Sequence, residues 1–128
     1  MEIRIEIITL ALLLIVGLSH ILQPRAWVDF FSHLRERGAA GVFVVALLHV
    51  PLGVLVVAFH QRFTGLALVT TVIGWSSILK ATIYFLFPRI ELNSLGMVTP
   101  QRAWMFVCSG WVSVALSALI SYSVLSRA

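Results

Sequence analysis

Charged residues are scarce in this chain of 128 residues, which is 11% charged and 60% hydrophobic. An ordinary globular domain carries roughly 25% charged residues. A soluble chain this short could not hide so much apolar surface from water, so the composition excludes a soluble domain and favours lipid as the solvent. The formal net charge is +4. The basic residues are scattered between apolar blocks, so we interpret them as topology determinants and expect no nucleic-acid partner.

Cysteine is nearly absent as well, and the single one, Cys108, excludes an intramolecular disulfide and a paired-thiol metal motif. A metal site would need clustered cysteine, histidine and carboxylate ligands, which the sequence does not offer. Ligation of b-type haem would need histidines at matching depths on facing helices, and the histidines here do not pair in that way. We therefore expect neither a metal nor a cofactor.

Acidic residues are missing from the middle of the apolar blocks. The five in the chain are Glu2, Glu6, Asp29, Glu36 and Glu91. Cation-coupled and proton-coupled transport usually relies on buried carboxylates. A pocket in this chain is therefore expected to be polar and positive, suited to an anion or to a neutral amphiphile such as a lipid or a quinone. The sequence also shows no carboxylate pair, activated nucleophile or cofactor loop, so we expect no enzyme.

Four long apolar blocks are what the sequence does have. A helix needs about 20 residues, at about 1.5 Å per residue, to cross roughly 30 Å of hydrocarbon. The blocks are continuously apolar and lack the alternation of a lipid-facing barrel strand. The sequence predicts an all-α membrane protein, a four-helix transmembrane bundle forming a single domain over residues 1–128. The predicted spans cover residues 5–22, 39–60, 63–87 and 103–125.

An amphipathic pattern lies between the first two spans, at residues 24–37. Its apolar positions have helical spacing, and Pro24 suits the first turn of a helix. We predict a short interfacial helix whose anchoring side chains are Trp27, Phe30, Phe31 and Leu34. A gate or a lipid-headgroup sensor is the alternative role for this helix.

The other connections predict how the helices are arranged. The connection at Gln61 and Arg62 is so short that the second and third helices should form an antiparallel hairpin. Thr99 and Pro100 suit the N-cap and first turn of the last helix. Basic residues near the span ends favour the side of the first and third connections (Arg25, Arg35, Arg37, Arg89, Arg102) over the other side (Arg4, Arg62, Arg127). The positive-inside rule then places both termini outside the cytoplasm, in a membrane of the bacterial inner type.

Lys80 is the strongest single candidate for function, because a charged residue inside a span usually faces the protein interior or a wet cavity. Ser76 and Tyr84 lie four residues to either side of it and complete a polar stripe. Gly74 and Ser77 belong to an adjoining seam of small residues. The alternative is that the long stem of Lys80 carries its charge to the lipid headgroups.

Two histidines extend this candidate site. His49 lies near the middle of the second span, where Pro51 should kink the helix. His49 either makes a local hydrogen bond or contacts a ligand or proton. His20 completes a basic pocket or is an ordinary interfacial histidine, and we expect His60 to be interfacial.

Serine recurs every four residues in the last span, at Ser109, Ser113, Ser117 and Ser121. Small residues at this spacing let helix backbones approach closely. We expect a packing seam, with its partner helix either in this chain or in another. A serine-lined water path is the alternative.

Known families of small four-helix membrane proteins do not account for the chain. Small multidrug exporters depend on a glutamate in the middle of the first helix, where this chain has only Glu6 at the edge. Fluoride channels have glycine-rich arginine and threonine-phenylalanine motifs that are missing here. Residues 17–24 resemble the end of the first helix in DoxX-type membrane proteins, but the resemblance covers one helix and assigns no family.

Two function hypotheses follow. The first is a non-enzymatic, oligomeric membrane protein with a polar, positively biased site or pore for an anion or a small amphiphile. Its lining would be Lys80, His49, Ser76, Ser77 and Tyr84, with His20 as a further candidate. The second is an accessory subunit that docks onto a larger membrane complex through the serine seam. The expected partners are the lipid bilayer and either further copies of the chain or other membrane subunits.

Overall fold

The structure is a computed structural model that describes residues 1–127. Helix accounts for 88% of it, and this described part contains no strand. The helices, in chain order, are α1 (Glu2–Leu22), α2 (Pro24–Glu36), α3 (Ala39–Phe59), α4 (Leu68–Leu86), α5 (Pro88–Leu95) and α6 (Trp104–Arg127). Two 3₁₀ turns, η1 (Gly65–Ala67) and η2 (Pro100–Arg102), precede α4 and α6.

Four of these helices are long and apolar enough to cross a membrane: α1, α3, α4 with η1, and α6 with η2. This confirms the prediction of an all-helical chain with four membrane-length helices. The start of α4 differs most from its predicted position at residue 63. His60 and Thr64 have extended backbones, and Gly65 has a φ of 64°, so the chain turns before the helix begins. The hairpin connection is therefore longer than expected.

The third connection contains a helix that was not expected. Pro88 occupies the first turn of α5, where its missing N–H costs no hydrogen bond. Thr99 and Pro100 do mark a helical start, but of η2 and not of α6 itself. Together α5 and η2 form an ordered bridge between α4 and α6.

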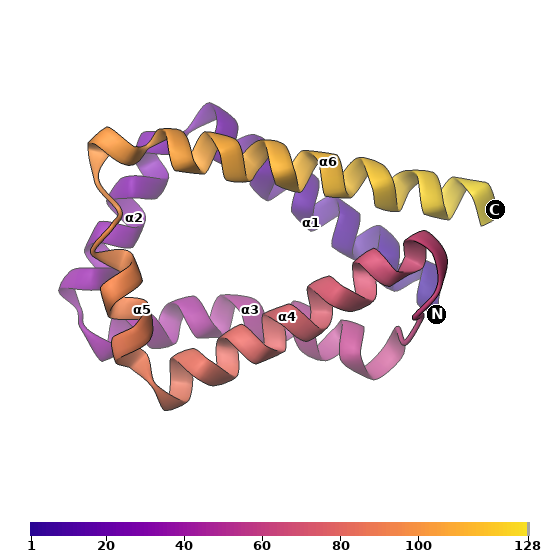
Figure 1. Ribbon diagram of the computed structural model, residues 1–128, viewed down its shortest axis with the longest axis horizontal. Coiled ribbons are helices and arrows are strands. Elements are labelled where there is room, and N and C mark those ends of the chain that lie inside the picture. Colours follow the sequence, from indigo (N-terminus) through magenta and orange to yellow (C-terminus); the bar gives the residue numbers. More distant parts are fainter. Residues whose placement is uncertain (128) are drawn as a thin grey trace.

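The long helices form two pairs, as Figure 1 shows: α1 packs along α6, and α3 packs along α4. Helices α2 and α5 lie at one end of the pairs. Both termini lie at the opposite end, with the α3–α4 connection. The space between the pairs is therefore bounded by helices along its length and by α2 and α5 at one end.

Close backbone contact joins α1 to α6. A Cβ atom added to Gly110 would lie 2.5 Å from the carbonyl oxygen of Gly17, and one added to Gly17 would lie 2.9 Å from that of Gly110. Ser113 flanks the same contact, because its Cβ is 2.9 Å from the added Cβ of Gly17. The part of the serine seam near Ser113 therefore faces α1 of the same chain. Gly74 makes a similar close approach to Val56, between α4 and α3.

Helix α2 forms where predicted, but its apolar face turns toward the protein. Leu34 is 7% exposed and packs where α2 meets α3, at Gly41. Trp27 stacks on His20 of α1, and only Phe30 among the four expected anchors remains substantially exposed, at 37%. This packing does not support the anchoring role expected for the apolar face.

The close α1–α6 contact predicts that a large side chain at Gly110 destabilises the protein more than one at an exposed position of α6. We expect Gly110→Leu to push the two helices apart, because the clash is with backbone atoms that no side-chain rotation can relieve. Overpacking of this kind costs about 1–3 kcal/mol. The thermal unfolding midpoint in detergent should fall by about 4 °C per kcal/mol, between the values for smaller and larger domains.

Ala115→Leu is the matched control, since Ala115 is exposed on the same helix. It should change stability by no more than about 0.5 kcal/mol. Equal midpoints for the two variants would contradict the close packing of α1 on α6.

Candidate functional site

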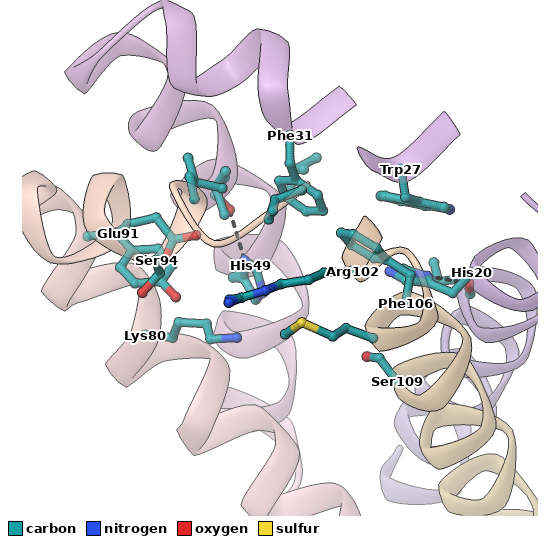
Figure 2. Close-up of a pocket in the computed structure, with 17 residues that line it drawn as sticks. His20, Trp27, Phe31, His49, Lys80, Glu91, Ser94, Arg102, Phe106 and Ser109 are labelled. Atoms are coloured by element: carbon teal, nitrogen blue, oxygen red, sulfur yellow. Dashed lines mark hydrogen bonds between the residues drawn. The ribbon is translucent and has the colours of Figure 1, made fainter. Parts of the chain in front are cut away.

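A cavity of about 680 Å³ lies between the two helix pairs, at the end covered by α2 and α5 (Figure 2). Side chains from all the helices α1 to α6 and from η2 contribute to its wall. Its volume is within the range of about 300–1,000 Å³ that is typical of small-molecule sites. The arrangement of the helices thus creates a site that no single helix could form.

The cavity brings together four of the six candidate site residues. Lys80 and Tyr84 line it from α4, His49 from α3 and His20 from α1. Ser76 and Ser77 are not part of the wall. The Ser77 hydroxyl instead donates a hydrogen bond to the carbonyl oxygen of Ile73, at 2.8 Å.

The side chain of Lys80 extends into the cavity, as does that of Arg102 from the opposite wall (Figure 2). Arg102 lies in η2, just before α6, and had been interpreted only as a topology determinant. Glu91 of α5 adds a carboxylate and is 7% exposed. The site is therefore mixed in charge, with two cations and one carboxylate among these three side chains; the expected positive bias stays a prediction, and the carboxylate was not foreseen.

Sequence reasoning missed Glu91 because α5 was not predicted. A signal was present, since Pro88 at a first turn with an acidic residue three positions later is a pattern typical of helix starts. Ser94, one turn further along α5, also lines the cavity.

Each cavity histidine is held by its own helix. His49 Nδ1 lies 2.8 Å from the carbonyl oxygen of Val45, and His20 Nδ1 lies 2.7 Å from that of Val16. A carbonyl oxygen only accepts, so Nδ1 carries a proton in both rings. The local hydrogen bond expected for His49 is present, and it leaves Nε2 without a partner among residues 1–127. That nitrogen is free to bond a ligand.

Aromatic rings form another part of the wall. The His20 and Trp27 rings stack with centroids 4.2 Å apart, and Phe31 stacks on Phe106 at 5.6 Å. The Trp27 indole N–H donates to the Ser19 hydroxyl at 2.9 Å, which fixes the orientation of its ring. This wall offers a rigid apolar surface beside the charged one.

The serine seam divides between two environments. Ser109 lines the cavity, Ser113 lies against α1, and Ser117 is 4% exposed. Ser117 and Ser121 donate hydrogen bonds to the carbonyl oxygens of Val114 and Ser117, respectively. Their hydroxyl groups are thus satisfied within α6.

A second polar cluster lies at the opposite end of the helix pairs and was also missed. Glu6 and His60, expected at the edge of a span and at the membrane interface, are both 0% exposed. His60 Nε2 is 2.8 Å from Glu6 Oε1, and the Arg127 guanidinium contacts the other oxygen of Glu6. The chain therefore does contain a buried carboxylate.

Beside this cluster, Arg62 forms an exposed salt bridge with Glu2, at 2.7 Å. The hydrogen bond to the Glu2 carboxylate raises the pKa of Arg62 above its ordinary value. Arg62 therefore stays charged at the end of the molecule that holds the termini.

Comparison of the chain with protein-family models, with curated proteins and with solved structures found no match. Within residues 1–127, no group of three or more histidine, cysteine, aspartate or glutamate side chains is placed to hold a metal ion.

Lys80 offers a direct test of the cavity, because it is the only lysine in the sequence. We expect a small, water-soluble amine-reactive reagent to modify Lys80 in the detergent-solubilised protein, since its side chain lies in a cavity wide enough to admit the reagent. Mass spectrometry of the digested protein locates the modification.

The Lys80→Arg variant should lose this modification while its terminal amine still reacts. A wild-type protein that reacts only at its terminal amine would contradict an accessible Lys80 in the cavity.

Proposed function

We propose that this protein is an integral membrane protein that binds a small amphiphile with an anionic head in the cavity between its helix pairs. The observation that carries the proposal is the division of the cavity wall into a charged part, with Lys80 and Arg102, and an aromatic part, with Trp27, Phe31 and Phe106. An amphiphile likewise combines a charged head and an apolar tail in one molecule, so each part of the wall has a matching part of the ligand.

The charged part suits a head group of low charge. An ammonium and a guanidinium supply charge-assisted hydrogen bonds to a carboxylate or phosphate oxygen, and Arg can bond such a group through two N–H donors. Glu91 in the same wall carries the opposite formal charge. The remaining net charge of these three side chains is +1, which favours a singly charged anion. His49 Nε2 adds one more hydrogen-bonding position.

The aromatic part suits an acyl or ring-containing tail. The stacked pairs leave flat faces and edges that gain contact energy from an apolar partner. Because the cavity lies between two helix pairs that lipid would surround, a membrane-dissolved ligand would not have to pass through water to reach it. Transport of the same ligand is the extended form of this proposal.

The proposed orientation places α2 and α5 at the cytoplasmic surface of a bacterial-type inner membrane, with both termini outside. The arginines at the α2–α5 end support it. The outer face of α2, with Arg25, Asp29 and His33 exposed, would contact headgroups and water while its inner face covers the cavity. In this arrangement α2 is a cap at the membrane surface.

The alternative role, as an accessory subunit, has less support. The docking surface expected for it was the serine seam, and at Ser113 and Ser117 this seam is packed within the chain. The remaining exposed apolar faces, such as those with Trp75 and Trp111, are what lipid contact itself requires. Assembly into oligomers through those faces stays a proposal.

Binding can be measured through Trp27, which lines the cavity. In a variant with Trp75, Trp104 and Trp111 replaced by Phe, a brominated fatty acid should quench the remaining tryptophan fluorescence saturably. Lys80→Met should weaken this binding about ten- to hundredfold, since a hydrogen bond to a charged group contributes about 1.5–3 kcal/mol.

Arg25→Met is the matched control, because it removes one positive charge from an exposed site outside the cavity wall. It should bind the fatty acid like the parent, and a brominated fatty alcohol should bind weakly to all variants. Equal quenching by acid and alcohol, unaffected by Lys80→Met, would refute an anion-binding cavity.

A further inference from the structure

The buried cluster at the end of the termini connects the two helix pairs. Glu6 comes from α1 and Arg127 from α6, whereas His60 ends α3 and Thr71 lies in α4. The Glu6 carboxylate bonds His60 through one oxygen and Arg127 through the other. The cluster therefore joins the pairs at the end opposite the cavity.

The hydrogen bonds around Thr71 fix where one proton lies. The Thr71 hydroxyl is 2.7 Å from the carbonyl oxygen of Arg62, which only accepts, so the single hydroxyl proton points there. The hydroxyl oxygen then accepts from the Arg62 backbone N–H, at 3.2 Å, and from His60 Nδ1, at 3.0 Å. His60 Nδ1 must therefore carry a proton.

The other ring nitrogen faces the carboxylate. With Nδ1 protonated, the 2.8 Å contact between His60 Nε2 and Glu6 Oε1 needs a second proton, held by the imidazole or by the carboxyl group. In either case the His60–Glu6 pair holds one more proton than a neutral histidine and an ionised glutamate would hold together.

Loss of that proton cannot leave every hydrogen bond intact. If Nδ1 keeps its proton, then Nε2 and Glu6 Oε1 face each other as two acceptors. If the proton moves to Nε2, then the Thr71 hydroxyl must turn toward Nδ1, and its oxygen faces the Arg62 carbonyl without a proton between them. A buried polar group left unpaired destabilises the contact that contains it.

We infer that this cluster is a proton-dependent latch that holds the two helix pairs together at the end of the termini. With the proton present, Glu6, His60, Thr71 and Arg127 are all paired. Without it, the contact between pairs weakens, and the space between them can open at that end. The Arg127 side chain, which contacts Glu6, is 31% exposed, so the cluster lies next to the protein surface.

Charged groups around the cluster do not replace the proton. Arg127 pairs with Glu6, and Glu2 and Arg62 pair with each other in an exposed position, where the Glu2 carboxylate is also near enough to His60 for the two charges to interact. The latch is also independent of what the cavity binds, so its test needs no ligand.

The test measures the distance between the helix pairs in a Cys108→Ser background. Spin labels at Thr64, in the α3–α4 connection, and at Ser126, in α6, report across the cluster. The pH is varied from about 5 to about 8, the range in which histidine commonly changes charge. We expect a short, narrow distance distribution at low pH and a longer, broader one at high pH. Labels at Ile15 and Trp111, within the α1–α6 pair, should report no change.

Two variants separate the proton from other effects. Glu6→Gln keeps the shape of a protonated carboxyl group and can donate to a neutral His60, so the short distance should persist at every pH. His60→Gln removes the imidazole and should abolish the pH response. Asp29→Asn, which removes an exposed carboxylate on α2 at the opposite end of the helix pairs, should respond as the parent does. An unchanged distance in the parent, or a pH response that survives in Glu6→Gln, would overturn the latch; if His60→Gln fails to fold, Glu6→Gln decides alone.

Discussion

Four helices of this chain are long and apolar enough to cross a membrane, and in that proposed setting the weak attraction between apolar helices in lipid is the constraint on which the structure depends. Lipid tails are as apolar as the side chains they surround, so helices in a bilayer associate through close packing and polar contacts and not through escape from water. In this chain, close packing and polar contacts join different helices. Backbone contact at Gly17 and Gly110 joins α1 to α6, and the buried Glu6–His60 contact joins that pair to α3 and α4.

A cavity follows from this division. The pairs are held together by a polar cluster at one end and by α2 and α5 at the other, so side chains between them need not interlock along the whole length. Residues that would otherwise pack are free to line a space. Lys80 and His49 lie there, at positions where lipid contact would leave their polar groups without partners.

The sequence predicts the long helices well, because the length and hydropathy of a span are local properties. It predicts less where a contact decides the outcome. The spacing of Trp27, Phe31 and Leu34 defines an apolar face for α2, but whether that face meets lipid or protein depends on α1, α3 and α6. Glu6 looks peripheral by its distance along the chain, and only the return of Arg127 and His60 to the same place buries it. The position of the short α5, and with it that of Glu91, likewise depends on the contacts of α5 with α2, α3 and α4 as well as on its own residues.

The position of Lys80 links the positive charge of the cavity wall to the proposed binding of an anion in the cavity. Snorkelling would carry its ammonium group to the headgroups, yet its side chain extends into the space between the helix pairs, toward Arg102 (Figure 2). In the proposed membrane setting, two cations with one nearby carboxylate would leave an uncompensated charge that is costly unless water or an anion accompanies it. A bound anion would remove that cost, and a ligand that binds only the folded state stabilises it. Under the proposed function, the same uncompensated charge would favour an anionic occupant, and Glu91 would limit how much negative charge that occupant could carry.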